Sequence, residues 1–346
     1  MKFNIGCGIL AAAAVAGCQE PVNGGSMNIE NENYRQEIQA ACGRLDAIER
    51  TPRTVVFPVI SDLHTIREDV DTADPGRRNT MPVIAAMHQA DALADFDFFA
   101  DLGDIGLELP ENADPEAADA LLSDYAAMHR RSPKPAIVCM GNHDTSWGRI
   151  SHARFGEVMN RPGAENLPQL RFGADASYGY LDLREQRVRV FFLNTGRDYT
   201  STDEQNAFLR EKLEELPGDW LAVYLMHYAP APEGRWVMPG DSGEWGMHPS
   251  MAELAGIIAD SPHSAFVLCG DSHFDAEFHL GRVPGFITQG YGGIKPEWMP
   301  PGARRRDVDI SRTLLAEIAV LTPETRQIRL IRVGAGGAEA DREAEF

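Results

Sequence analysis

The stretch Ala136-Ile137-Val138-Cys139-Met140-Gly141-Asn142-His143-Asp144 joins a short apolar run to four residues of very different character. The five apolar residues have the length and composition of a buried β-strand. Gly141 is typical of a turn, and Asn142, His143 and Asp144 then follow with an amide, an imidazole and a carboxylate. We therefore expect a strand that ends where these three polar side chains enter a loop.

The same pattern recurs at four other places, where an apolar run ends in Asp or His. These segments are Asp62-Leu63-His64, Gly103-Asp104, His227 and Gly270-Asp271-Ser272-His273. In α/β sheets, binding sites form beyond the carboxyl ends of the strands. Because all five segments lie at such an end, the sequence predicts one shared site.

Strand-like and helix-like segments alternate through most of the chain. We expect helices near 80–94, 115–130, 203–216 and 249–260, preceded by an amphipathic helix from Tyr34 to Ile48, with Thr202 or Asp203 capping the 203–216 helix. We expect strands at 54–61, 96–102, 135–140, 187–194, 220–227, 264–269, 285–289, 313–321 and 326–333. Strands without an intervening helix, within 173–195 and 310–333, indicate antiparallel additions to the sheets.

Together the five segments resemble the calcineurin-like metallophosphoesterase superfamily, over about residues 54–295. The resemblance implies an α/β fold, a two-sheet β-sandwich flanked by helices in four layers (α/β/β/α). It implies a hydrolase that cleaves a small phosphate mono- or diester by attack of a hydroxide that bridges two divalent metal ions. Two such ions, about 3.5–4 Å apart, orient the phosphate and neutralise its developing charge. The choice among Mn, Fe, Zn and Mg stays open, because sites of mixed His and carboxylate ligands suit several of them.

The resemblance also assigns a role to each polar side chain of the five segments. The first metal would be held by Asp62, His64, Asp104 and His273, and the second by Asp104, Asn142, His227 and Asp271. His143 would be the general acid, a role suited to its near-neutral pKa. Asp144 is grouped with His143 as the residue that orients the catalytic loop.

One position departs from the family pattern. The last segment usually reads Gly-His-x-His, and Asp271 stands where the first His is expected. Its carboxylate could bind the second metal, could be too short and leave that metal weakly bound or bridged by water, or could only form hydrogen bonds, with one metal or none. We expect the first outcome, because the substituted residue is still a metal ligand. The third would give the alternative function, a non-catalytic or single-metal envelope lipoprotein that retains the fold for binding.

The N-terminus has the pattern of a secretory signal. Lys2 precedes a short apolar stretch, and Val15-Ala16-Gly17-Cys18 resembles the lipobox of bacterial lipoproteins. That resemblance implies cleavage before Cys18 and a lipid on its sulfur, so that the protein is anchored in the bacterial cell envelope and faces the periplasm or the exterior. An ordinary signal or a buried helix that contains a Cys is the alternative. The predicted organisation is a lipoprotein signal peptide at 1–17, a flexible tether at 18–31, a metallophosphoesterase-like domain at 32–333 and a disordered tail at 334–346.

The formal net charge is −20. A surface this acidic argues against nucleic-acid binding, and therefore against a nuclease. It also repels a phosphate ester at long range, so phosphate chemistry requires locally concentrated cations. The expected partners are a small phosphate-ester substrate and the membrane, through the lipid on Cys18. We interpret Arg304-Arg305-Arg306 as a solvated charge run.

Overall fold

The computed structural model describes residues 31–65, 80–106, 115–132, 134–145, 148–160, 169–196, 199–231, 248–293, 299–306, 308–309 and 312–346. The described α-helices are α1 Glu32–Leu45, α2 Met81–Ala94, α3 Pro115–His129, α4 His152–Met159, α5 Asp203–Glu214 and α6 Pro249–Asp260. The described strands are β1 Val55–Ile60, β2 Phe99–Asp101, β3 Ala136–Val138, β4 Leu170–Phe172, β5 Gly179–Leu183, β6 Val188–Leu193, β7 Leu221–Met226, β8 Ser264–Cys269, β9 Ala276–Leu280, β10 Val283–Ile287, β11 Leu315–Thr322, β12 Gln327–Gly334 and β13 Arg342–Glu345. The predicted signal peptide, Cys18 and nearly all of the tether lie outside the described residues. No helix in the described ranges is both long and apolar enough to cross a membrane.

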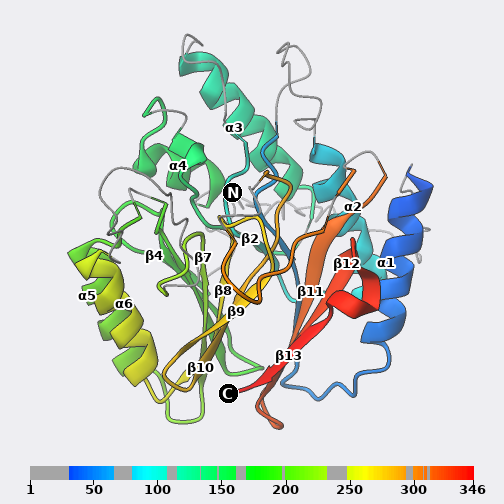
Figure 1. Cartoon of the computed structure of the whole chain (residues 1–346). Coiled ribbons are helices and arrows are strands. Elements are labelled where there is room, and N and C mark those ends of the chain that lie inside the picture. The colour runs from blue at the N-terminus through cyan, green and yellow to red at the C-terminus, as the bar shows by residue number, and fades with distance from the viewer. Residues whose placement is uncertain are drawn as a thin grey trace, which may run out of the picture.

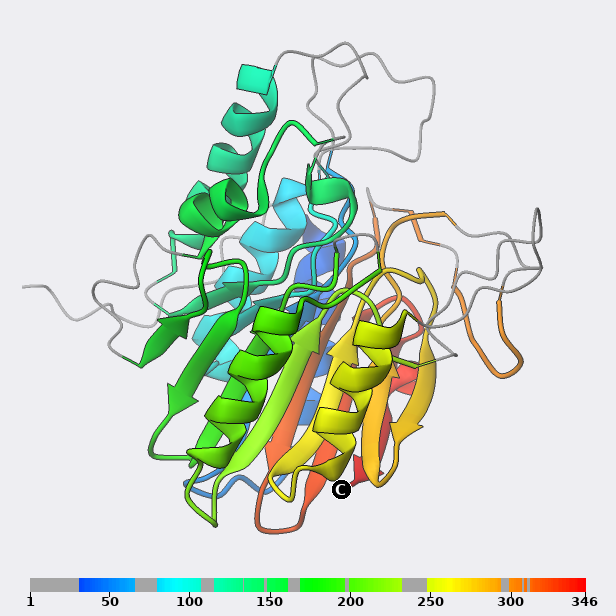
Figure 2. The ribbon, with the colours of Figure 1, turned by 90° about the vertical axis from the view of Figure 1, so that its left-hand side faces the viewer.

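The strands form two sheets that pack face to face between layers of helices (Figure 1). One sheet has the order β13-β12-β11-β1-β2-β3 and the other β4-β5-β6-β7-β8-β10-β9. Helices α1, α2 and α3 pack on the first sheet, and α5 and α6 lie side by side on the outer face of the second (Figure 2). The predicted two-sheet sandwich flanked by helices is confirmed.

Alternation along the central strands divides the apolar side chains between three cores. In β1, Val55, Phe57 and Val59 point between the sheets, whereas Val56 and Ile60 point towards the helices. Successive residues of a strand face opposite sides of a sheet, so a strand covered on both faces is apolar throughout. This explains why the predicted strands appear in the sequence as continuous apolar runs.

Strand directions bring the five polar segments to one edge of the sandwich. Strands β1, β2 and β3 are parallel neighbours in one sheet, and β6, β7 and β8 are parallel neighbours in the other. The backbone N–H of Gly270 donates to the carbonyl of His227 at 2.9 Å, and that of Asp62 donates to the carbonyl of Gly103 at 2.9 Å. The segments that follow β1, β2, β7 and β8 therefore lie side by side. As predicted, β5–β6 and β11–β12 pair antiparallel.

The expectation of a disordered tail at 334–346 is wrong. A short 3-10 helix, Gly337–Ala340, leads into β13, which pairs antiparallel with β12. Ala344 and Phe346 pack on the core between the sheets, whereas Glu343 on the other face lies 3.2 Å from Arg329. The tail thus has the alternation of an edge strand, which its many charges concealed in the sequence.

Besides β13 and the 3-10 helices, three short elements lie outside the predicted ranges, namely α4, β4 and β9. Helix α4 has only eight residues and begins at Ser151, whose hydroxyl accepts the N–H of Arg154 at 3.1 Å. The longer α5 begins as expected, because the side chain of Thr202 accepts the N–H of Gln205 at 3.1 Å. Short elements escape periodicity arguments because they hold too few repeats.

Candidate metal centre

Five side chains at the shared edge start from backbone in the left-handed region. The φ angles are 50° for Asp62, 45° for His64, 53° for Asp104, 67° for Asp271 and 56° for His273. In the described residues only ten non-glycine positions have positive φ, so half of them gather at this one place. Such conformations carry strain and persist where the surrounding structure enforces them, often at functional sites. The backbone therefore marks the same residues as the sequence motifs.

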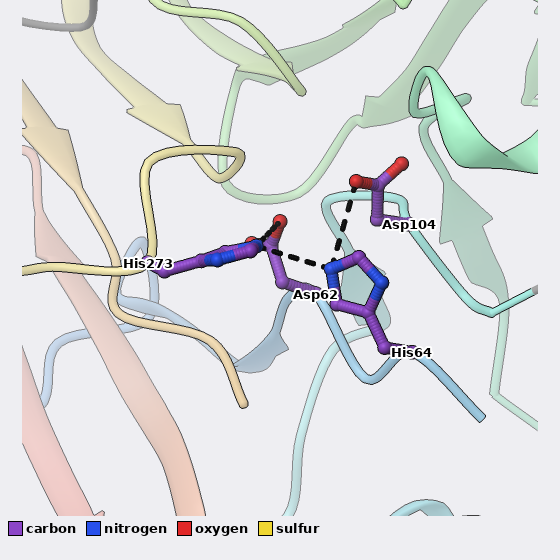
Figure 3. A group of neighbouring side chains, drawn as sticks. All are labelled: Asp62, His64, Asp104 and His273. Carbon is purple, nitrogen blue, oxygen red and sulfur yellow. Dashed lines mark hydrogen bonds and ion pairs between the residues drawn. The ribbon is translucent and has the colours of Figure 1, made fainter. Parts of the chain in front are cut away.

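The first predicted ligand set converges on a single point (Figure 3). Asp62, His64, Asp104 and His273 are all buried, and each offers one ligand atom within 4.8 Å of the others. The Nε2 atoms of His64 and His273 lie 3.0 Å apart, and Nε2 of His273 lies 3.3 Å from Oδ1 of Asp62. Two imidazole nitrogens and two carboxylates that face one another in this way require a proton or a cation between them.

Backbone carbonyls orient two of the imidazoles towards the centre. Nδ1–H of His227 donates to the carbonyl of Leu102 at 2.8 Å, and Nδ1–H of His273 donates to that of Gly293 at 3.1 Å. A histidine that donates through Nδ1 presents Nε2 as the metal-binding atom. Both rings are therefore fixed with Nε2 directed inwards.

The second predicted ligand set gathers around His227. Its Nε2 lies 3.1 Å from Oδ1 of Asn142, 3.3 Å from Oδ2 of Asp104 and 3.8 Å from Oδ1 of Asp271. The substituted residue Asp271 thus reaches the same side of the centre as Asn142 and His227. Asp104 contacts both sets, since its Oδ2 also lies 3.8 Å from Nε2 of His64.

Asp144 is the support of this arrangement and is fully buried. Its carboxylate accepts the backbone N–H groups of Asp104 at 3.0 Å, Ile105 at 2.9 Å and Gly141 at 2.7 Å. It therefore joins the turn after β2 to the turn after β3 and acts as a positioning residue, not as a group that touches substrate. Burial and the nearby charge of Asp104 raise its pKa to about 7.

His143 is the imidazole of the centre that is partly open to solvent. A third of its side chain is exposed, its Nε2 lies 3.9 Å from Oδ2 of Asp104, and its ring meets that of His64 edge to face at 5.1 Å. Its backbone N–H donates to Oδ1 of Asp104 at 2.9 Å. This geometry places a partly exposed imidazole beside the ligand sets.

The buried carboxylates of the centre divide into two groups by pKa. Burial alone would raise the pKa of Asp62 and of Asp104, but His273 for the first and His227 for the second outweigh it and hold both below the usual range. Burial raises the pKa of Asp271 to about 8, and the charges of Asp62 and Asp104 raise it against the opposing effect of His227. Among the predicted metal ligands, Asp271 is thus the carboxylate whose pKa is raised.

Arginines that we interpreted as a solvated run hold the last motif in place. The guanidinium of Arg305 donates to the carbonyls of His273 at 3.1 Å and Gly292 at 2.8 Å. Arg304 pairs with the backbone of Asp275, and Arg306 donates to its carboxylate at 2.9 Å. Sequence reasoning missed this role, because three consecutive arginines in a loop carry no periodicity that reveals a partner.

The residues present fit divalent metal ions. The two sets offer imidazole nitrogen, carboxylate oxygen and one amide oxygen, which are ligand types that Mn, Fe, Zn and Mg sites use. Backbone carbonyls fix two imidazoles with Nε2 directed inwards, and the carboxylate of Asp271 is buried at the same centre. Both features favour a positive charge there. The number and identity of the ions are not set by this geometry.

Comparisons with known proteins agree with the fold. The family model described as calcineurin-like phosphoesterase matches residues 56–275. A dimetal phosphatase from Danio rerio has a similar structure, with a TM-score of 0.55 and 11% identity over 84% of this chain and 99% of that one. A purple acid phosphatase from yellow lupin (Lupinus luteus) seeds gives a TM-score of 0.53 and 14% identity over 84% of this chain and 53% of that one. The search of curated proteins finds no match.

Proposed function

The chain belongs to the calcineurin-like phosphoesterase family, and we propose that it is a metal-dependent hydrolase of a small phosphate mono- or diester. The observation that carries the proposal is Asp104, whose Oδ2 lies between the two ligand sets, 3.8 Å from His64 Nε2 and 3.3 Å from His227 Nε2. A carboxylate shared in this way is the feature that a pair of adjacent cations requires. When bound, two such cations neutralise phosphoryl charge and lower the pKa of water.

The chain's own residues supply orientation and proton transfer. The phosphoryl-binding position lies between the two ligand sets. One side is formed by Asp62, His64 and His273, and the other by Asn142 and His227. His143, partly exposed beside Asp104, donates a proton to the departing alkoxide. Asp144 keeps the turns that carry Asp104 and Asn142 in register.

The test is hydrolysis of p-nitrophenyl phosphate and bis-p-nitrophenyl phosphate by purified protein that begins at residue 19, with Mn²⁺ added. We expect the unchanged protein to hydrolyse at least one of these esters. His143→Ala should lower the turnover number by about 10²–10⁴-fold, because it removes the general acid. His279→Ala, on β9 and outside the centre, is the matched control and should retain full activity. Undiminished turnover in His143→Ala would refute the role of His143.

The alternative is a binding protein that keeps the fold, and Asp271 is the feature that favours it. Metal analysis separates the two functions. The hydrolase requires metal bound at both ligand sets, whereas a chain that binds no metal after reconstitution with Mn²⁺, Zn²⁺ or Fe²⁺ is not a metal-dependent enzyme.

We further propose that the protein is anchored in the bacterial cell envelope by a lipid on Cys18. The support is the sequence Val15-Ala16-Gly17-Cys18 after a short apolar stretch. The full chain should partition into the membrane fraction of a bacterial host and incorporate labelled fatty acid. Cys18→Ser should abolish the label, and a label retained in that variant would overturn the anchor.

A further inference from the structure

Asp101 is a buried carboxylate in a strand whose other residues are apolar. It ends β2, and its side chain faces the helices, as does that of Phe99, whereas Ala100 packs between the sheets. A buried charge is costly unless it is paired or hydrogen-bonded. An acid at this position therefore indicates a role beyond packing.

Helix α3 holds one oxygen of this carboxylate. Tyr125 and His129 are four residues apart on the helix and so share one face. The Tyr125 hydroxyl donates to Oδ2 of Asp101 at 2.6 Å, and Nε2 of His129 lies 3.4 Å from the same oxygen. Burial and the charge of Asp101 raise the pKa of Tyr125 well above its ordinary value, so the hydroxyl keeps the proton that it donates. Nδ1 of His129 lies 3.3 Å from Nε2 of His88 on α2, so a second helix backs this contact.

The other oxygen of Asp101 holds the turn that follows β2. Oδ1 accepts the backbone N–H of Gly103 at 3.0 Å. Gly103 and Asp104 both have positive φ, 99° and 53°, and a Cβ on Gly103 would lie 2.6 Å from the backbone nitrogen of Gly141. Such a turn is strained and tightly packed, and a side-chain acceptor two residues earlier stabilises it.

Three metal-ligand residues depend on the position of this turn. Asp104, which contacts both ligand sets, is part of it. The carbonyl of Leu102 accepts Nδ1–H of His227 at 2.8 Å. The carbonyl of Gly103 accepts the backbone N–H of Asp62 at 2.9 Å. A displacement of the turn would therefore move ligands on both sides of the centre.

We propose that Asp101 is a positioning residue of the metal centre, which ties the turn that presents Asp104 to helix α3 through Tyr125. The proposal rests on the proposed function, because it concerns the ligands of the metal ions that this function requires. Asp101 acts through the backbone of the turn, and not as a ligand. Outer partners of metal ligands typically contribute about 10–100-fold to metal affinity.

The test measures Mn²⁺ binding to the purified protein by equilibrium dialysis. Asp101→Leu removes both oxygens at similar size, whereas Asp101→Asn keeps an acceptor for the N–H of Gly103. Tyr125→Phe removes one buried hydroxyl and keeps the ring. Tyr224→Phe is its matched control, because the Tyr224 hydroxyl is also buried and lies 2.7 Å from Oγ of Ser264 in the other sheet. Urea unfolding gives the stability of every variant.

We expect Asp101→Leu to lower the affinity for Mn²⁺ at both ligand sets by about 10–100-fold, and Asp101→Asn to recover most of it. Tyr125→Phe should lower this affinity by about tenfold, at the lower end of that range. Tyr224→Phe should leave it unchanged, whatever its effect on the urea midpoint. Unchanged affinity in Asp101→Leu, or equal loss in the two tyrosine variants, overturns the proposal.

The same measurements separate this proposal from the proposed function. Should Asp101→Leu not fold, the two tyrosine variants decide between the outcomes above. Mn²⁺ binding that depends on Tyr125, in a protein that hydrolyses no ester, would refute the proposed function and retain the positioning role. Ester hydrolysis with an affinity for Mn²⁺ that depends on neither Asp101 nor Tyr125 would retain the function and overturn the positioning role.

Discussion

Asp62 and Asp271 are buried carboxylates on the two sides of the same centre, and their environments differ. Asp62 accepts the backbone N–H of Asp271 at 3.0 Å as well as the hydroxyl of Ser61, and it lies 3.3 Å from Nε2 of His273. Burial would raise the pKa of Asp62, but His273 outweighs it and holds that pKa below its ordinary value. Asp271 is 3.8 Å from Nε2 of His227, and burial raises its pKa to about 8.

The difference shows where the centre depends on a cation. On the side of Asp62, the imidazole of His273 faces the carboxylate directly, with Nε2 3.3 Å from Oδ1. The side of Asp271 carries a carboxylate that prefers to be neutral until a cation approaches, because the protein supplies too little positive charge there. We infer that metal occupancy at the second set depends more strongly on pH and on metal concentration than occupancy at the first.

The largest effect is expected from Asp104→Asn, which weakens both sides at once. Loss of the shared negative charge should lower turnover of p-nitrophenyl phosphate on the order of 10³-fold and reduce metal content at both sets. Asp97→Asn, at the other end of the strand region, is the control. If Asp104→Asn keeps full metal content and rate, the two sides do not share this carboxylate.

Asp271→Asn should affect one side only. We expect the affinity of the second set for Mn²⁺ to fall by about 10–100-fold, while the first set still binds. Equilibrium dialysis over a range of Mn²⁺ concentrations measures Mn²⁺ binding to the first and to the second ligand set. Asp271→His restores the usual family ligand and should recover the affinity of the second set. Equal loss at both sets in Asp271→Asn would remove the distinction between the two sides.

Arg305 provides a smaller perturbation of the first side. Its guanidinium holds the carbonyls of His273 and Gly292, next to the Gly293 carbonyl that orients the imidazole of His273. Arg305→Ala should weaken metal binding at the first set by about tenfold, since outer partners of ligands contribute that much. Arg312→Ala, on an exposed side chain, should change nothing. An unchanged affinity in Arg305→Ala would show that the loop holds its shape without this contact.

The smallest effect concerns the pH dependence of stability in chelated protein. The folded-state pKa of Asp271, about 8, lies above its ordinary value of 3.8, so the folded state binds this proton more tightly. The stabilising contribution is therefore present at low pH and is lost as pH rises through about 8, with a slope of at most about 1.4 kcal/mol per pH unit. Asp271→Asn removes this slope.

Urea unfolding at pH 5 and pH 8 with a chelator measures that contribution. From pH 5 to pH 8 the free energy of unfolding should fall because of Asp271 in the unchanged protein, and this fall should be absent in Asp271→Asn. Saturating Mn²⁺ should abolish this difference in pH dependence between the two proteins, because the bound cation keeps the carboxylate of Asp271 ionised at both pH values. If the free energy of unfolding depends on pH in the same way in both proteins, titration of Asp271 does not cause that dependence.

The sequence predicted the parts of the fold that long patterns encode. Apolar runs gave the central strands, and 3.6-residue periodicity gave the helices from α1 to α6 except the short α4. The edge strand β13 was missed because charged residues on its open face masked the alternation of Ala344 and Phe346. One face of β13 is exposed, and so this strand leaves a weaker apolar signal than a strand covered on both faces.

The first ligand set and the supporting role of Asp144 could be predicted from the sequence, but the other supports could not. Asp62, His64, Asp104 and His273 were expected from their positions after apolar runs, and the structure brings them together. The role of Arg305 depends on contacts between segments that are distant in the sequence. Positive φ at the ligand residues likewise has no signal in the residue types alone.

The amino-acid sequence by itself determined which chemical groups this protein brings to the ends of its strands, and also the replacement of a family His by Asp271. Only the tertiary structure decided that Asp104 lies between the two ligand sets, that backbone carbonyls orient His227 and His273, and that Asp271 is less well compensated than Asp62. The physical reason is that ligand identity is a local property of the chain. Distance, burial and charge balance are instead set by two sheets that meet at one edge, and therefore by the packing of the whole domain.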